Sequence, residues 1–198
     1  MPNIPASLVK ELREKTGAGM MDCKRALETA EGDLEKAVTI LRQQGIAQAS
    51  QKSQRTAKEG IIFSYIHPGD RLGVMVEVNC ETDFVARTED FRQLAKDLAM
   101  QIAATNPLVI NRSELGPELI EKEQGIYHAQ ALNEGKPEKV LDRIVSGKME
   151  KYYQEAVLLE QPFIKDQERI VQDLVTQAIA KLGENIVVRR FVRFRVGE

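Results

Sequence analysis

The chain lacks tryptophan and has only two cysteines, Cys23 and Cys80, and two histidines, His67 and His128. The cysteines lie far apart in the sequence and form no CxxC pair, which favours a reducing, cytoplasmic compartment without a disulfide framework. With so few thiol and imidazole ligands, we expect no metal site. No apolar run is long enough to span a bilayer, and the N-terminus lacks the pattern of a signal peptide, so we expect no membrane contact.

An excess of one charge is also missing. The net charge is −2 over 198 residues, so the chain as a whole is not built to follow a nucleic-acid backbone. The sequence has no glycine-rich phosphate loop, no HExxH motif and no catalytic signature around Cys80. These absences predict a binding protein that is not an enzyme and that carries no cofactor of its own.

At the N-terminus, apolar residues at helical spacing predict a three-helix module over residues 1–45, in which Gly45 closes the third helix. Met20 and Met21 follow directly on a loop with two glycines. Adjacent methionines are usually core residues, but their flexible thioethers also suit an adaptable binding surface. Residues 46–59 are polar and rich in Gln, Ser and Lys, which predicts a linker.

Residues 60–198 predict an α+β core. Strands at 61–66 and 74–78 are separated by a turn sequence and should form an antiparallel hairpin. Two helices joined by a short link should fold back as a protruding helical hairpin at about 117–155. This hairpin has apolar residues to spare, and such a surface is a candidate for packing against a second copy of the chain.

The closing strand, residues 186–196, has one face that we expect to join the core, with Arg190 the exception: Ile186, Val188, Val192, Phe194 and Val196. Its other face carries Arg189, Arg193 and Arg195, which we expect to be solvated. Arginine interleaved with aromatic residues can also bind single-stranded nucleic acid. With Lys52, Arg55 and Lys58 of the linker, these arginines support an alternative function, an RNA- or ribosome-surface-binding protein.

The most informative stretch is the corner between the strand ending near residue 78 and the helix expected from about 88 to 105. Thr82 or Asp83 is suited to cap the turn that follows. A large apolar ring, Phe84, comes next. Either it folds back and staples the helix to the sheet, or it is presented to a pocket on another protein. Composition does not separate these two interpretations.

Three segments closely resemble the translation elongation factor Ts family: residues 7–13 (SLVKELR), 16–24 (TGAGMMDCK) and 77–85 (EVNCETDFV). The closing Gly183–Ile186 turn with Arg189 and Arg190 fits the same family. The resemblance implies a guanine-nucleotide exchange factor for elongation factor Tu. It also implies an N-terminal module similar to ubiquitin-associated (UBA) domains, followed by the α+β core.

In that family the Thr-Asp-Phe-Val motif dislodges the magnesium ion of the GTPase. The motif falls here on Thr82, Asp83, Phe84 and Val85. Further partner contacts are expected at Leu12, Met20, Met21, Asn79 and Cys80. The factor would act on the magnesium and GDP of its partner and would need no cofactor.

Longer members of the family duplicate the core, whereas this chain has room for one copy. In this it is similar to short members that act as homodimers, which implies a complex of two copies with two copies of elongation factor Tu. The helical hairpin and the closing strand are both candidates for the dimer contact.

Overall fold

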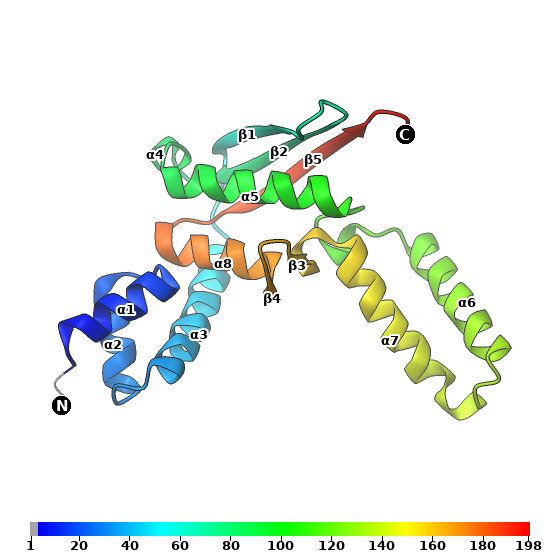
Figure 1. The fold of residues 1–198 in the computed structure, drawn as a ribbon, viewed down its shortest axis with the longest axis horizontal. Helices are drawn as coiled ribbons and strands as arrows, with labels where there is room; N and C mark the ends of the chain where they lie inside the picture. The colour runs from blue at the N-terminus through cyan, green and yellow to red at the C-terminus, as the bar shows by residue number, and fades with distance from the viewer. Residues whose placement is uncertain (1–3) are drawn as a thin grey trace. The chain divides into compact units, whose positions relative to one another are not determined.

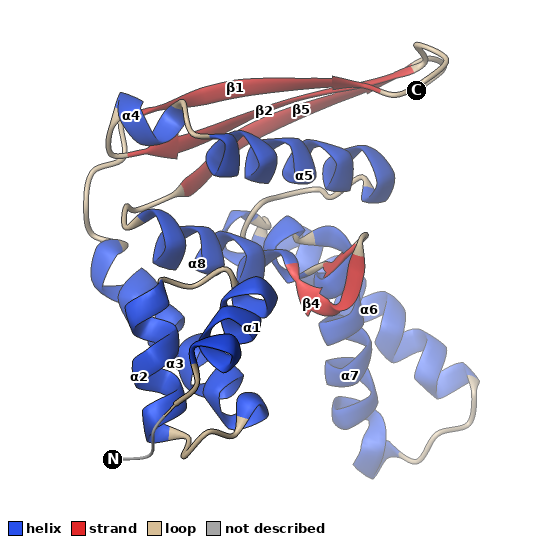
Figure 2. Cartoon of the chain, turned by 60° about the vertical axis from the view of Figure 1, so that its left-hand side comes forward, coloured by secondary structure: helices blue, strands red, loops and turns tan. Residues whose placement is uncertain are grey.

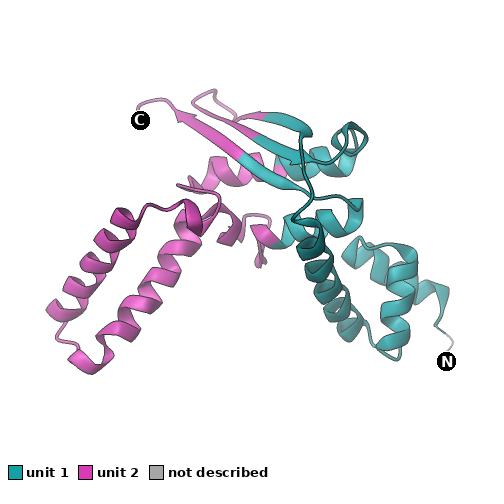
Figure 3. Cartoon of the chain, turned by 180° about the vertical axis from the view of Figure 1, so that it is seen from behind, with its two compact units in different colours: residues 1–63, 77–96, 173–189 teal, residues 64–76, 97–172, 190–198 magenta. Residues whose placement is uncertain are grey.

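The computed structural model of the chain describes residues 4–198 (Figure 1). These residues divide into two compact units, shown in Figure 3. Unit 1 comprises the residues up to 63 together with 77–96 and 173–189, and unit 2 comprises 64–76, 97–172 and 190–198. Helices combine with small antiparallel sheets, so the predicted α+β class is confirmed.

Three helices open unit 1: α1 (Ala6–Thr16), α2 (Met20–Thr29) and α3 (Leu34–Lys52). Helix α1 ends at Gly17, whose φ of 70° is the left-handed conformation that glycine adopts without strain. Helix α3 begins at Asp33, whose carboxylate accepts a hydrogen bond from the Lys36 amide at 3.0 Å. The three helices share one apolar core, made of Val9, Leu12, Cys23, Ala26, Leu27, Ala30 and Ala37.

The prediction that Gly45 closes the third helix is wrong. Helix α3 continues to Lys52, so half of the predicted linker is helical. The Ala, Gln and Lys residues that follow Gly45 are good helix formers. A Cβ at Gly45 would lie 3.6 Å from the Cβ of Ala180 in α8 (Val171–Leu182), so the glycine marks a close approach of two helices.

A three-stranded sheet has the order β1 (Glu59–Ile66), β2 (Leu72–Cys80) and β5 (Val187–Arg195). Helix α5 (Glu89–Thr105) lies along one face of this sheet (Figure 2). The β2 residues that alternate toward the core are fully or almost fully buried: Val74, Val76, Val78 and Cys80. Between β2 and α5 the chain forms a single-turn helix, α4 (Asp83–Ala86).

The closing strand corrects a second prediction. Val188 is buried as expected, but Val192, Phe194 and Val196 are 37%, 70% and 57% exposed. The Arg193 side chain, expected in solvent, is only 10% exposed and pairs with Glu198 at 2.8 Å. The alternation of the strand identified the two faces correctly, but it did not show which of them the rest of the fold covers.

In unit 2, α6 (Pro117–Asn133) and α7 (Glu138–Ala156) form the predicted helical hairpin. Arg112, from the short turn η1 (Arg112–Glu114), fixes the base of this hairpin. Its guanidinium bonds to Glu150 at 2.6 Å and to Glu160 at 2.5 Å, and lies 4.1 Å from the centre of the Tyr153 ring. Among residues 4–198, no helix combines the length and apolar character needed to cross a bilayer.

A small second sheet was not predicted. It follows the turn η2 (Leu158–Glu160) and consists of β3 (Pro162–Phe163) paired antiparallel with β4 (Asp166–Ile170). The fully buried side chain of Gln101 holds it in place. Its amide nitrogen donates to the Pro162 carbonyl at 3.1 Å, and its oxygen accepts from the Ile164 amide at 2.9 Å.

Candidate functional site

The predicted corner is the short helix α4 at the end of β2, within unit 1 (Figure 2). Thr82 is its N-cap, with an extended backbone and a side-chain oxygen that accepts from the Val85 amide at 3.4 Å. The Asp83 carboxylate pairs with Arg87 at 2.8 Å. Thr88 then starts α5 and donates its hydroxyl to the Val85 carbonyl at 2.7 Å. The corner is therefore closed by its own local bonds.

Phe84 is 80% exposed, the largest exposed fraction among the large apolar side chains of residues 4–198. A staple between helix and sheet would bury the ring, so that interpretation is wrong. The residue two positions on, Ala86, is buried and anchors α4. The structure thus holds the backbone of the turn and leaves the aromatic ring in solvent.

Asn79 and Cys80, the two expected contacts that precede the corner, both have bonds within unit 1. The Asn79 amide nitrogen donates to the Glu59 carbonyl at 3.1 Å. Cys80 is fully buried, and its thiol donates to the Thr82 carbonyl at 3.1 Å. Burial, with the nearby Glu184 carboxylate, raises the pKa of the Cys80 thiol to about 11, so the thiol stays protonated near neutral pH. Direct partner contact by Cys80 is not compatible with this conformation.

Sequence reasoning missed the residue that braces the corner from outside. Glu184, in the turn between α8 and β5, accepts bonds from the Glu81 and Thr82 amides, both at 3.0 Å. Its other oxygen accepts the Thr82 hydroxyl at 2.6 Å. Glu184 and Thr82 are 102 residues apart, so no local pattern pointed to this pairing. The Gly183–Glu184–Asn185 sequence indicated only a turn.

The expected contacts in the N-terminal helices have two different environments. Met20 and Met21 are 59% and 63% exposed at the start of α2. Leu12 is completely buried in the core of the three helices, so the expected direct contact through Leu12 is not compatible with this conformation. The methionine pair remains a candidate surface, because two adjacent exposed thioethers are unusual on a solvated helix.

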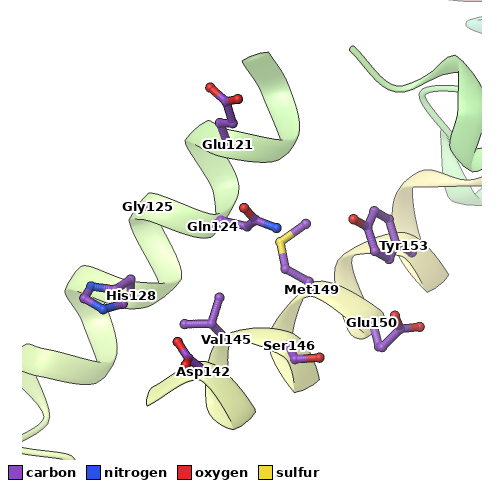
Figure 4. Close-up of a pocket in the computed structure, with 10 residues that line it drawn as sticks. All are labelled: Glu121, Gln124, Gly125, His128, Asp142, Val145, Ser146, Met149, Glu150 and Tyr153. Carbon is purple, nitrogen blue, oxygen red and sulfur yellow. The ribbon is translucent and has the colours of Figure 1, made fainter. Parts of the chain in front are cut away.

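The helical hairpin of unit 2 has a cleft of about 620 Å³ between α6 and α7 (Figure 4). Gln124 and Met149 point toward one another across it. The cleft is lined by Glu121, Gln124, Gly125, His128, Asp142, Val145, Ser146, Met149, Glu150 and Tyr153. It contains none of the predicted site residues. Within residues 4–198, no three His, Cys, Asp or Glu side chains are grouped in a way that could hold a metal ion.

Three of the six basic residues behind the nucleic-acid alternative form ion pairs. Arg55 lies 3.6 Å from Glu81, and both Arg193 and Arg195 bond to Glu198. A surface that reads phosphates needs unpaired cations arranged along a groove. The pairing of these three arginines weakens the alternative.

Comparison with known proteins adds the family. A model of the family described as "Elongation factor TS" matches residues 48–198. Among curated proteins, "Elongation factor Ts" of Thermodesulfovibrio yellowstonii is 62% identical over 98% of this chain and 97% of its own length. Proteins of the same name from Moorella thermoacetica and Desulforamulus reducens are 60% and 59% identical, over 98% and 100% of this chain and 96% and 91% of their own lengths.

Proposed function

This chain belongs to the elongation factor Ts family and is a translation elongation factor, and we propose that it acts as a guanine-nucleotide exchange factor for elongation factor Tu. One observation carries the proposal. Phe84 lies exposed on a turn whose backbone is fixed, within the Thr82–Val85 motif. A rigid aromatic side chain in solvent is suited to fill a pocket on a partner protein.

The mechanism that we propose is a wedge. Inserting Phe84 between elements of the GTPase buries its ring, which is worth about 1.5–3 kcal/mol. This free energy is gained only when those elements move apart. Mg²⁺ requires near-ideal octahedral oxygen geometry, so the movement dislodges the ion that bridges the GTPase and the phosphates. A factor that binds the nucleotide-free form more tightly must weaken nucleotide binding by the same ratio.

The other residues of the motif have supporting roles in this proposal. Asp83 is held by Arg87 in the free protein and presents a carboxylate beside the ring, near the magnesium water shell. Thr82 and Val85 set the turn that carries Phe84. Met20 and Met21 make a second contact that keeps the GTPase bound to the factor.

No covalent bond is formed or broken in this exchange. We therefore propose that the chain is not an enzyme, uses no cofactor or metal of its own, and acts on the magnesium and GDP of its partner. We also propose a cytoplasmic location, because the two distant cysteines suit a reducing compartment. The net charge of −2 supports the absence of direct nucleic-acid binding. A steep loss of RNA binding with added salt would instead identify the phosphate-reading alternative.

The experiment is stopped-flow release of fluorescent GDP from the cognate elongation factor Tu. The wild-type chain should accelerate release, and Phe84→Ala should reduce that acceleration by about 10- to 100-fold, because the burial free energy of the ring is lost. Leu108→Ala is the matched control. Leu108 is 56% exposed and lies outside the corner, so its removal should leave the rate unchanged.

Circular dichroism must show that both variants are folded. If a folded Phe84→Ala variant accelerates release as well as the wild type does, the wedge mechanism is wrong. If the wild type itself does not accelerate release, the exchange function is wrong for this chain.

We further propose that the chain forms a homodimer, giving a complex with two copies of elongation factor Tu. The support is a set of exposed apolar side chains on or next to the strands of unit 2, which we call the sheet patch: Ile66, Met75, Val192, Phe194 and Val196. Gly73 lies beside it, since a Cβ there would be 3.0 Å from Ile66 Cδ1. Contiguous exposed apolar side chains on a sheet are typical of a surface that another protein covers. This favours the closing strand over the helical hairpin as the dimer contact.

A further inference from the structure

We propose that Glu184 is a positioning residue for nucleotide exchange: it fixes the backbone from which Phe84 projects. This inference rests on the proposed exchange function. Glu184 does not belong to the Thr82–Val85 motif, and it reaches the corner from the turn between α8 and β5. All of the contacts that carry the inference lie within unit 1.

The first argument is the number and type of bonds that end on the Glu184 carboxylate. It accepts two backbone amides, from Glu81 and Thr82, and the Thr82 hydroxyl, at 3.0, 3.0 and 2.6 Å. Hydrogen bonds to an ionised acceptor are roughly twice as strong as neutral ones. The two amides belong to the residues that join β2 to α4, where no strand or helix partner is available. Glu184 therefore takes the place of regular secondary structure at this junction.

The second argument is that Thr82 is fixed at every polar atom. Its amide and hydroxyl donate to Glu184, and its carbonyl accepts the buried thiol of Cys80 at 3.1 Å. Its hydroxyl oxygen also accepts from the amide of Val85, the third residue of α4. Phe84 is two residues further along. A change in the orientation of Thr82 therefore rotates α4 and moves the exposed ring.

The third argument is that the turn carrying Glu184 is itself fixed. The Asn185 amide donates to the Glu81 carboxylate at 2.7 Å, and the Glu81 amide donates to the Glu184 carboxylate. Two hydrogen bonds therefore join Glu81 to the 184–185 turn. The Asn185 side chain, which is 4% exposed, donates to the Arg55 carbonyl at 2.7 Å. Arg55 closes the circuit through its ion pair with Glu81 at 3.6 Å. The turn that holds Glu184 is therefore itself fixed to unit 1, and Glu184 in turn fixes the position of the corner.

Two substitutions and one control test this role. Glu184→Ala removes both acceptor oxygens and with them all three hydrogen bonds. Glu184→Gln keeps the length of the side chain and one oxygen for the two amides, and its NH2 group can donate to the Thr82 hydroxyl oxygen. Glu168→Ala is the control, because Glu168 is an exposed glutamate in β4, which belongs to unit 2 and not to the corner.

GDP release from elongation factor Tu should be measured over a range of factor concentrations. Glu184→Ala should lower the maximal rate of release by roughly 10- to 100-fold, the cost of misplacing a group by about 1 Å. The half-saturating concentration should change less, because the Met20 and Met21 contact is intact. Glu184→Gln should restore part of the rate, and Glu168→Ala should behave as the wild type.

A readout without the partner separates positioning from general stability. Backbone amide exchange followed by NMR should show faster exchange at Glu81 and Thr82 in Glu184→Ala, while amides of α2 keep their protection. In a Phe84→Ala background, adding Glu184→Ala should cause little further loss of rate, because both substitutions prevent the insertion of the Phe84 ring.

The outcomes are distinguishable. If the wild type accelerates release and Phe84→Ala does not, but Glu184→Ala matches the wild type, the positioning role is wrong and the exchange function stands. Additive losses in the double variant also contradict positioning. If Glu184→Ala unfolds, Glu184→Gln decides alone, and full activity with unchanged amide exchange overturns the inference. If the wild type does not accelerate release, both proposals fail together.

Discussion

Phe84 and Phe194 are both strongly exposed phenylalanines, at 80% and 70%, but their surroundings differ. Phe84 stands on a single helical turn beside the Asp83–Arg87 ion pair, and its backbone is fixed from a distant turn. Phe194 lies on a strand among Val192, Val196 and the other residues of the sheet patch. An isolated ring on a braced turn is suited to enter a narrow opening, whereas a ring in a flat apolar surface is suited to broad packing.

The difference shows that exposure alone does not define a function. Both rings would gain free energy on burial, and the neighbouring side chains determine what kind of surface buries them. If the comparison is correct, substitutions at the corner should change nucleotide exchange and leave self-association intact. Substitutions in the sheet patch should have the reverse effect.

The largest effect is expected from Phe194→Asp. A carboxylate within an apolar interface would lose hydration without a partner, so the dimer dissociation constant should rise by about 100-fold or more. Sedimentation equilibrium measures this change. Leu108→Asp is the control for adding one charge at an exposed apolar position, and it should leave association unchanged.

The same Phe194→Asp chain should still accelerate GDP release per protomer. A monomeric variant without exchange activity would show that the two surfaces are not independent. An unchanged dimer would show that the sheet patch is not the dimer contact and would favour the helical hairpin instead.

Gly60→Ala should lower the stability of the fold and affect the corner more than the sheet patch. A Cβ at Gly60 would lie 2.2 Å from the Val78 carbonyl oxygen, and its φ of 145° is strained for any other residue. We expect a loss of about 2–4 kcal/mol in the free energy of unfolding, measured by urea denaturation. Because Val78 is close to the end of β2, exchange should suffer more than self-association does.

Gly125→Ala is the matched control for this glycine. It lies in α6 with no atom within 4 Å of the added Cβ, so it should gain about 0.5–1 kcal/mol of stability. Equal stabilities for the two variants would contradict the close approach at Gly60.

The pH dependence of the free energy of unfolding should reveal the contribution of the buried Cys80 thiol, which bonds to the Thr82 carbonyl. The folded-state pKa of about 11 lies above that of an unfolded thiol, about 8.5. The stabilisation from the buried neutral thiol is therefore complete below about pH 8.5 and is lost as the pH rises through 11. Its size is about 3 kcal/mol, because each unit of difference in pKa is worth about 1.4 kcal/mol.

Cys80→Ser keeps a donor for the Thr82 carbonyl but does not ionise in this range. Between pH 8 and 11 the wild type should lose about 3 kcal/mol more stability than Cys80→Ser, as followed by urea denaturation at each pH. Parallel curves for the two proteins would exclude the proposed contribution of the thiol.

The smallest effect is expected from Met20→Ala or Met21→Ala. Each should raise the half-saturating concentration of the factor in the GDP release assay by about two- to fivefold, because part of an apolar contact is lost. The maximal rate should not change, in contrast to Phe84→Ala. A reduced maximal rate would mean that the methionines belong to the wedge itself.

The sequence by itself determined the features that depend on neighbouring residues. The sequence predicted Thr82 or Asp83 as the cap of the turn before α5, because capping involves only the next three residues, and Thr82 is the cap in the structure. The helices and the two hairpins, of strands and of helices, followed from apolar periodicity and from short turn sequences. Three sequence segments, one of which carries Phe84, also identified the resemblance that the comparisons bear out.

Only the tertiary structure decided what covers each surface. Periodicity placed Val192 and Phe194 on one face of a strand, but the absence of a covering layer left that face exposed. The sequence predicts a helix terminus at Gly45, but in the structure the lack of a side chain there lets α3 and α8 approach closely. Glu184 reaches Thr82 across 102 residues. These features depend on contacts between distant segments, and a local pattern carries no information about which segments meet.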